Sequence, residues 1–445
     1  MLPRRLLPLA MLPLMAPQGL LAVPGIPEPA PADLSLPEAL RAAWSRQSGL
    51  QAGQAMVDRA RLEADAADAL LLPTLQAQAG WMRTDEPMMA FGLKLNQARI
   101  AAPDFNPASL NHPEAVSGLG GSLTLSQPLY AGGRITAARR ATRALAEAEA
   151  ASQAHRKQQV ALAVVQAYFG TQAAAAGVAY AEDTLKTAQG TEAFVAARVE
   201  QGLMLKADLA RVKAWRAQAE AGLAEARRQE TSARSGLALL IGGAVPSGLA
   251  TPLEPAVATA PQGAGQRADL KAAALQAEAA KAYARAVGGS LKPEVGVSLS
   301  AGAARETFGA TGGSWTTASL GAKWTFAWGD TRKTQAARAG ARAAELAQAW
   351  QQAQAARETT EAEGAVAAAE AKVKAATEGL AAAQEARDLR QARHREGLLP
   401  LTELLDAESA LQGARAFRLA TLLELRTAHA QRALALGTPI EGVTE

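Results

Sequence analysis

Two short stretches constrain the fold of this chain most. Residues 201–209 read Gln-Gly-Leu-Met-Leu-Lys-Ala-Asp-Leu, and residues 396–404 read Glu-Gly-Leu-Leu-Pro-Leu-Thr-Glu-Leu. Each interrupts a long Ala-rich run, and Gly at such a point favours the left-handed backbone that ends a helix. The acid in each stretch, Asp208 or Glu403, then falls in the first turn of a returning helix, where it complements the helix dipole. We therefore expect a helical hairpin at each stretch.

The two stretches belong to an internal repeat. They lie 195 positions apart (397 minus 202), while Leu50 and Leu270, like Pro73 and Pro293, lie 220 apart (270 minus 50, 293 minus 73). Self-similarity in this order indicates a duplicated unit, and most of the difference between the two spacings falls in the loop between the strands, where insertions are tolerated. The order in each copy is helix, strand, strand, very long helix, return helix. The expected divisions are a first repeat at 33–242, a linker at 243–266, a second repeat at 267–437 and a tail at 438–445.

The strands are predicted from strict alternation of apolar and polar residues. Such segments are about 8 to 12 residues long, close to the 9 to 11 that cross a membrane at a tilt, and two-faced alternation is typical of a transmembrane β-barrel. Four strands are too few to close a barrel, since known barrels begin at about eight. Several chains are therefore expected to share one barrel. The alternating segments are 74–81, 118–130, 294–300 and 319–326.

The helices are predicted to be long and thin. Hydrophobic residues make up 49% of the chain but aromatic ones only 4%, and Ala dominates the helical runs, so helices can pack closely with little bulk. A capping-box pattern at Ser35 and Glu38 predicts a first helix that runs to about Leu72. The longest helix, between Gly133 and Gln201, would measure on the order of 100 Å at about 1.5 Å per residue.

Residues 1–32 are expected to be a signal peptide and a Pro-rich segment. Arg4 and Arg5 precede an apolar run through about Val23, and both Ala22 and Ala32 are acceptable cleavage points. A disordered apolar tail is the alternative. No later segment offers about 18 uninterrupted apolar residues, so we expect the mature chain to enter a membrane as strands.

Charge and composition exclude several function classes. The formal net charge of +4 comes from 46 basic and 42 acidic residues without a basic block, so nucleic acid is not an expected partner. The chain has no cysteine, and its four histidines lack metal-ligand spacing. There is no P-loop, and the glycines at 118–121 lack dinucleotide-binding spacing. We expect no catalysis, no cofactor and no metal.

The chain resembles the outer-membrane efflux proteins of the TolC family. The resemblance rests on both repeats, both Gly-Leu turns, Gln-Pro-Leu-Tyr-Ala-Gly-Gly-Arg at 127–134 and Arg-Ala-Asp-Leu at 267–270. It implies a mixed fold, all-α plus membrane β. A homotrimer would form a 12-stranded outer-membrane β-barrel that continues into a long periplasmic α-helical barrel. It also implies the outer membrane of a Gram-negative-type bacterium, with contacts to its lipids.

The resemblance implies a passive exit duct in a tripartite efflux pump or a type I secretion system. Its partners would be a periplasmic adaptor and an inner-membrane pump, and the pump would select drugs, metal ions or polypeptides. A non-conducting periplasmic adaptor or scaffold is the alternative, because adaptors also carry helical hairpins and signal sequences.

Four residues align with the family's gate. Glu403 and Asp406 match two acidic ring positions; spaced i, i+3, they share one helix face, and three copies would form rings that can bind cations. Acids favoured by the helix dipole are the plainer interpretation. His394 and Asp208 match a pair that links neighbouring hairpins in the closed state.

That second pair is an incomplete match to the family's latch. Leu399 and Ala207 stand where the best-known members carry Arg and Thr. The plainer interpretation of His394 is a helix-end histidine favoured by the dipole.

Two further sets of residues are candidates for surface roles. Lys323, on a polar strand face, is expected to line the lumen. The adaptor-contact tip, or else ordinary hairpin packing, is expected at Gly202, Leu203, Met204, Gly397, Leu398 and Leu399. A membrane aromatic girdle, or else barrel packing, is expected at Trp81, Tyr130, Trp315, Trp324, Phe326 and Trp328.

Overall fold

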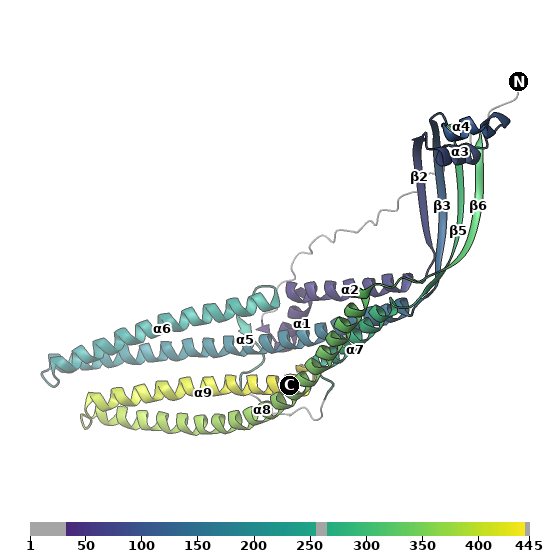
Figure 1. The fold of residues 1–445 in the computed structure, drawn as a ribbon. Coiled ribbons are helices and arrows are strands. Elements are labelled where there is room, and N and C mark those ends of the chain that lie inside the picture. Colours follow the sequence, from purple (N-terminus) through teal and green to yellow (C-terminus); the bar gives the residue numbers. More distant parts are fainter. Residues whose placement is uncertain (1–32, 255–264, 441–445) are drawn as a thin grey trace.

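The computed structural model describes residues 33–254 and 265–440. Four long strands form a sheet at one end, and paired long helices extend away from it (Figure 1). The expected signal segment at 1–32 lies outside the described residues, as do 255–264 of the linker and 441–445 of the tail.

The helices of the two halves correspond in length as the repeat predicts. Helices α2 and α7 have 22 residues each, α5 and α8 have 67 and 68, and α6 and α9 have 36 each. In the first half they are α2 (Ser48–Ala69), α5 (Arg134–Glu200) and α6 (Lys206–Ile241). In the second half they are α7 (Ala268–Gly289), α8 (Trp328–Arg395) and α9 (Leu401–Leu436).

The first expected helix is two helices. The capping box at its start is present, since the Ser35 amide donates to Glu38 Oε2 (2.9 Å) and the Glu38 amide to Ser35 Oγ (3.4 Å). Helix α1 (Leu36–Arg46) then stops at Gln47, whose ψ of 118° is extended, and α2 starts one residue later. The break lets α1 contact both α5 and α6.

The sheet joins the two halves. Its antiparallel order is β2-β3-β5-β6, with Leu75 opposite Leu125 and Leu125 opposite Leu299. The pairing of β3 with β5 turns the two expected hairpins into one sheet and leaves β2 and β6 as its edges. The strands are β2 (Thr74–Thr84), β3 (Val116–Ala131), β5 (Glu294–Arg305) and β6 (Gly312–Lys323).

Two segments expected to be loops contain regular structure. Residues 85–115 hold α3 (Pro87–Asn96), the 3₁₀ helix η1 (Ala102–Phe105) and α4 (Pro107–Asn111). In the linker, β4 (Gly248–Leu249) pairs in parallel with β1 (Asp33–Leu34). The loop between β5 and β6 was expected to end near Trp315, but strand β6 already begins at Gly312.

The sheet exposes its apolar face. Leu75 is 70% exposed and Leu320 is 72% exposed, while Gly118 and Ala304 on the polar face are buried. A sheet of a water-soluble protein has the opposite arrangement, with its apolar face against a core. The observed arrangement fits a sheet whose apolar face meets lipid instead of water.

The main core lies between α1, α5, α6 and α9. Tyr168 and Phe169 of α5 are its largest buried side chains. Helix α5 is also long and apolar enough to cross a membrane by length and composition, which differs from our expectation of no such segment. Since α5 packs against α2, α6, α7 and α9, its apolar residues serve helix packing.

The hydroxyl of Tyr168 is a buried junction. It donates to the carbonyl of Leu34 (2.7 Å) and accepts from the amide of Thr251 (2.9 Å), so it joins α5 to the first described residues and to the linker.

We expect Tyr168→Phe to lower the free energy of unfolding by about 1–3 kcal/mol, because the buried carbonyl of Leu34 and the half-buried amide of Thr251 lose their partner. Thermal unfolding in detergent would measure the loss. Tyr180→Phe is the matched control on the same helix, since the Tyr180 hydroxyl makes no hydrogen bond within the described ranges. Equal melting temperatures for the two variants would contradict this role of Tyr168.

Candidate functional site

Both helical turns lie at the end of the molecule farthest from the sheet (Figure 1). In the first, Gly202 has φ of 77°, its amide donates to Val199 O (3.0 Å), and the Leu203 amide donates to Arg198 O (2.8 Å). This pair of hydrogen bonds defines a Schellman motif, which requires a left-handed residue. The two Gly-Leu stretches therefore end their helices for the reason inferred from the sequence.

The second turn repeats this geometry. Gly397 has φ of 78°, its amide donates to His394 O (3.0 Å), and the Leu398 amide donates to Arg393 O (2.9 Å). No atom lies within 4 Å of a Cβ built on either glycine, so the need for Gly is set by the backbone alone.

The acids that follow the two turns have different roles. Asp208 Oδ2 accepts from the Leu205 amide (3.4 Å), so Asp208 caps its own helix. In the second turn Pro400 occupies the corresponding position and has no amide hydrogen to donate. Glu403 and Asp406 are exposed, and their carboxylates make no hydrogen bond or ion pair within residues 33–254 and 265–440.

His394 closes its own turn. Its ring is 6% exposed, its Nδ1 lies 2.9 Å from the carbonyl oxygen of Leu399, and it packs edge-on against Phe194 at 5.9 Å. The structure forms no ion pair between His394 and Asp208. The link between His394 and Asp208 of neighbouring hairpins and the plainer interpretation, a helix-end histidine favoured by the dipole, both stay predictions.

The tip residues divide into packed and exposed ones. Met204 packs against a small core of Val195, Val212 and Leu401 that joins the two hairpins. Leu203 is 63% exposed and Leu398 is 72% exposed.

Leu205, which the sequence analysis did not single out, is 70% exposed and extends the tip surface. We use "tip surface" for Leu203, Leu205 and Leu398. Leu399 is half-buried.

A buried charge lies just behind the tip. Glu408 of α9 is 6% exposed, and its Oε1 lies 3.9 Å from Arg387 Nε of α8. Burial raises the pKa of Glu408, against the opposing effect of Arg387 and Arg415. The sequence analysis missed Glu408, although it continues the buried 3-4 spacing of Leu401, Leu404 and Leu411.

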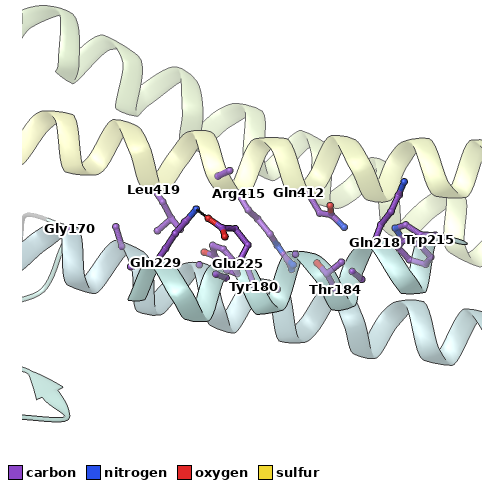
Figure 2. A pocket seen from close by; sticks show the side chains of 18 residues that line it. Gly170, Tyr180, Thr184, Trp215, Gln218, Glu225, Gln229, Gln412, Arg415 and Leu419 are labelled. Atoms are coloured by element: carbon purple, nitrogen blue, oxygen red, sulfur yellow. Dashed lines mark hydrogen bonds between the residues drawn. The ribbon is translucent and has the colours of Figure 1, made fainter. Parts of the chain in front are cut away.

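A groove of about 590 Å³ runs between α5, α6 and α9. Figure 2 shows Arg415 reaching from α9 across the groove toward Tyr180. The Arg415 guanidinium lies 5.0 Å from the Tyr180 ring, and its Nη1 is 2.8 Å from Asp183 Oδ2. These contacts connect the second hairpin to the first.

Most of the candidate aromatic residues lie at the helix end of the sheet. The Phe326 ring lies 6.3 Å from that of Trp324 and 5.2 Å from that of Trp328. Tyr130 pairs with Val295 on the apolar face of the same end. Trp81 is 66% exposed near the other end of the sheet.

Two residues lie on the polar face. A Cβ built on Gly302 would lie 2.4 Å from the Trp315 ring, so Trp315 covers that glycine on the polar face, away from Leu320 and the other apolar residues. Lys323 is opposite Glu294 at the helix end of the same face. Trp315 therefore does not share a face with the other candidate girdle residues.

Comparisons with known proteins agree with this architecture. A family model described as "Outer membrane efflux protein" matches residues 39–243 and 261–438. The MtrE outer membrane channel of Neisseria gonorrhoeae, in its open state, is 22% identical with a TM-score of 0.77, and the alignment covers 92% of this chain and 90% of that chain.

Two further solved structures are similar. The CmeC outer membrane channel of Campylobacter jejuni is 15% identical with a TM-score of 0.78, over 90% of this chain and 85% of that chain. The outer membrane protein VceC of Vibrio cholerae is 19% identical with a TM-score of 0.77, over 91% of this chain and 96% of that chain. At these identities the likeness shows a shared fold. No curated protein sequence matches the chain.

Glu408 predicts a pH dependence at the tip. A carboxyl group whose pKa is raised on folding stabilises the fold as pH falls from neutral, fully so below its unfolded pKa near 4.5. Glu408→Gln imitates the protonated group, so at pH 7 it should stabilise the α8–α9 hairpin by about 1–3 kcal/mol. The gain should shrink as the pH falls. Hydrogen exchange at the ends of α8 and α9 would measure it.

Glu385→Gln is the control, because Glu385 is an exposed acid on α8. Burial lowers the pKa of His429. This histidine adds the same pH dependence to the stability of every variant, so its effect cancels when the variants are compared. The groups that face Glu408 are Arg387 and Asp388 of α8, Asp183 of α5 and Arg415 of α9. A stabilisation independent of pH would show that the Glu408 charge is not the cause.

Proposed function

This chain belongs to the outer membrane efflux protein family, and on that premise we propose that three copies close one channel through the outer membrane. The observation that carries the proposal is the sheet, which exposes its apolar face and leaves the outer edges of β2 and β6 without a partner strand in the described chain. Three sheets of four strands give twelve, enough for a closed barrel. Closure would pair β6 of one copy with β2 of the next and remove both edges.

The channel is proposed to be the exit duct of a tripartite efflux or secretion system. Ser and Thr of the polar strand face, such as Ser122, Ser300 and Thr317, would line its lumen. Helices of 67 and 68 residues, each on the order of 100 Å long, would carry the duct across much of the periplasm toward an adaptor and an inner-membrane pump. Efflux is transport and involves no chemical reaction, which agrees with the expectation that the chain is not an enzyme.

The aromatic residues support two interfacial belts. Tyr130, Trp324, Phe326 and Trp328 would meet the inner interface of the membrane, and Trp81 the outer one. We assign Trp315 to the lumen, because it covers Gly302 on the polar face.

The tip is the proposed gate and docking end. Glu403 and Asp406, exposed and free of partners among the described residues, would form acidic rings in a trimer. The tip surface of Leu203, Leu205 and Leu398 would receive the adaptor, since exposed apolar side chains at one point mark interaction sites. His394 and Asp208 stay candidates for a link between neighbouring hairpins, although each also makes a contact within its own turn.

The barrel wall can be tested with two neighbouring residues of β5 that face opposite ways. Leu299→Arg should lose trimer and membrane insertion, since Arg on the lipid face near the midplane costs about 2–4 kcal/mol per copy. Ser300→Arg on the polar face should still assemble. Mass measurement in detergent would show about three times the 45.9 kDa chain for the parent, less any signal peptide.

Single-channel recording in planar bilayers separates the two candidate functions. A trimeric duct conducts, whereas a non-conducting periplasmic scaffold does not. A monomer extracted without detergent, or equal loss of assembly in both arginine variants, would overturn the barrel.

The acidic rings can be tested by cation block. Replacing Glu403 and Asp406 together by Ala should weaken block by multivalent cations applied from the tip side by about tenfold or more, a loss of roughly 1.4 kcal/mol of binding. Asp208→Ala is the control, because Asp208 holds the equivalent place in the first turn and caps Leu205. Unchanged block in the double variant would remove the rings from the proposal.

A further inference from the structure

The insertion between β2 and β3, residues 85–115, packs on the polar face of the sheet. Helix α3 contacts β3, β5 and β6, and Figure 1 shows α3 and α4 at the strand ends farthest from the long helices. The corresponding connection between β5 and β6 spans only residues 306–311. The duplicated unit therefore carries this element in one copy alone.

Two strand glycines make room for α3. A Cβ on Gly118 would lie 2.6 Å from Gln97 Nε2 and 2.7 Å from Leu93 Cδ1. A Cβ on Gly313 would lie 2.4 Å from the carbonyl oxygen of Asn96. By register, Gly118 and Gly313 share the face of Ser122 and Ser300, because side chains alternate along each strand. The end of α3 is thus in direct contact with the polar face.

Polar contacts fix α3 in this position. Gln97 is 1% exposed, and its Nε2 donates to the carbonyl of Ser117 (2.9 Å) and to that of Arg305 (3.4 Å). Arg99 Nη1 donates to Gln97 Oε1 (3.1 Å) and pairs with Glu306 (2.9 Å) in the short β5–β6 connection. A buried amide with two backbone partners indicates a defined seat.

We propose that residues 85–115 form a cap that narrows the outer mouth of the channel and limits the size of what passes there. The inference rests on the proposed trimer. Twelve strands about 4.8 Å apart and tilted by about 40° close into a ring roughly 24 Å across, while a helix with its side chains is about 10–12 Å thick. Three such helices, one from each wall, occupy most of that ring.

If α3 only stabilised the sheet, it would not need to lie on the polar face. The apolar face offers Leu119, Leu123 and Leu125 for hydrophobic contact, and a helix packed there would stabilise a sheet in water. α3 instead lies over glycines on the face that the trimer turns inward. Only on that face does a helix obstruct a passage.

The chain has no cysteine, so single cysteines can report on access to the lumen. Ser300→Cys places one on the polar face and Phe308→Cys, at a 92% exposed position, places one outside. Intact cells would be treated with a small methanethiosulfonate or with a bulkier dye-linked maleimide, neither of which crosses membranes. Each reporter would be combined with the parent cap, with Gln97→Ala/Arg99→Ala, and with residues 88–111 replaced by a short Gly-Ser link.

Removing the anchors should raise the rate at which the bulky reagent labels Ser300→Cys by about tenfold, since the lost hydrogen bonds and ion pair shift the cap's equilibrium by about 1.4 kcal/mol or more. Excision should raise it further. The small reagent should label Ser300→Cys at similar rates in all three backgrounds, and labelling of Phe308→Cys should not change. The anchor variant keeps the whole chain and remains informative if the excision does not assemble.

Failure of the cap proposal and failure of the proposed channel would give different labelling results. Bulky-reagent rates that stay the same with and without the cap, while the small reagent reaches Ser300→Cys, would overturn the cap and leave the channel standing. If the small reagent never reaches Ser300→Cys although Phe308→Cys is labelled, the polar face is not an aqueous lumen, and the proposed function itself fails.

Discussion

The rest of the structure depends on a sheet whose exposed apolar face and unpaired edges are unfavourable in water. Its four strands expose Leu75, Trp81 and Leu320 on one face and leave the backbone groups of β2 and β6 unpaired at both edges of the described chain. Each unpaired backbone group costs several kcal/mol in lipid, so the edges must close on further strands before the apolar face can meet a membrane. This one constraint supports both the membrane location and the proposed assembly of several copies.

Duplication supplies two similar halves, and the differences between them lie where function is proposed. The long helices differ by one residue, and both turns share one Schellman geometry. Pro400 removes the amide that would have engaged Glu403, which leaves that acid exposed at the tip. The inserted α3 occupies only one of the two strand connections, at the opposite end of the molecule. In the proposed duct, these two differences between the repeats lie at its two opposite ends.

Local chemistry made much of this fold predictable. Period-two alternation identified the strands, and glycines at helix ends identified both turns, because these signals act over a few residues. Three other features depend on distant segments: the packing of His394 against Phe194, the β3–β5 pairing and the seat of α3. Residues 87–96 gave no clear signal, since a short apolar run beside Pro87 does not distinguish a helix from a loop. Glu408 was missed because an acid suggests solvent, whereas its spacing with Leu404 and Leu411 places it inside.

The distribution of core packing determines which part of the duct can move. Fifteen buried apolar residues form the main core around the middle of α5, where α6 and α9 end, whereas three join the hairpins at the tip. Outside these cores, the Ala-rich helices gain little stability from burial. Exposed ion pairs such as Lys372 with Glu424 contribute about 0–1 kcal/mol each, so they affect the register of the helices more than the stability of the fold. Close to the tip, Glu408 adds a buried charge whose Oε1 has no hydrogen-bond partner in the described chain. Local opening is cheapest where buried apolar contacts are few, so the helices should separate first at the tip, where Glu403 and Asp406 lie.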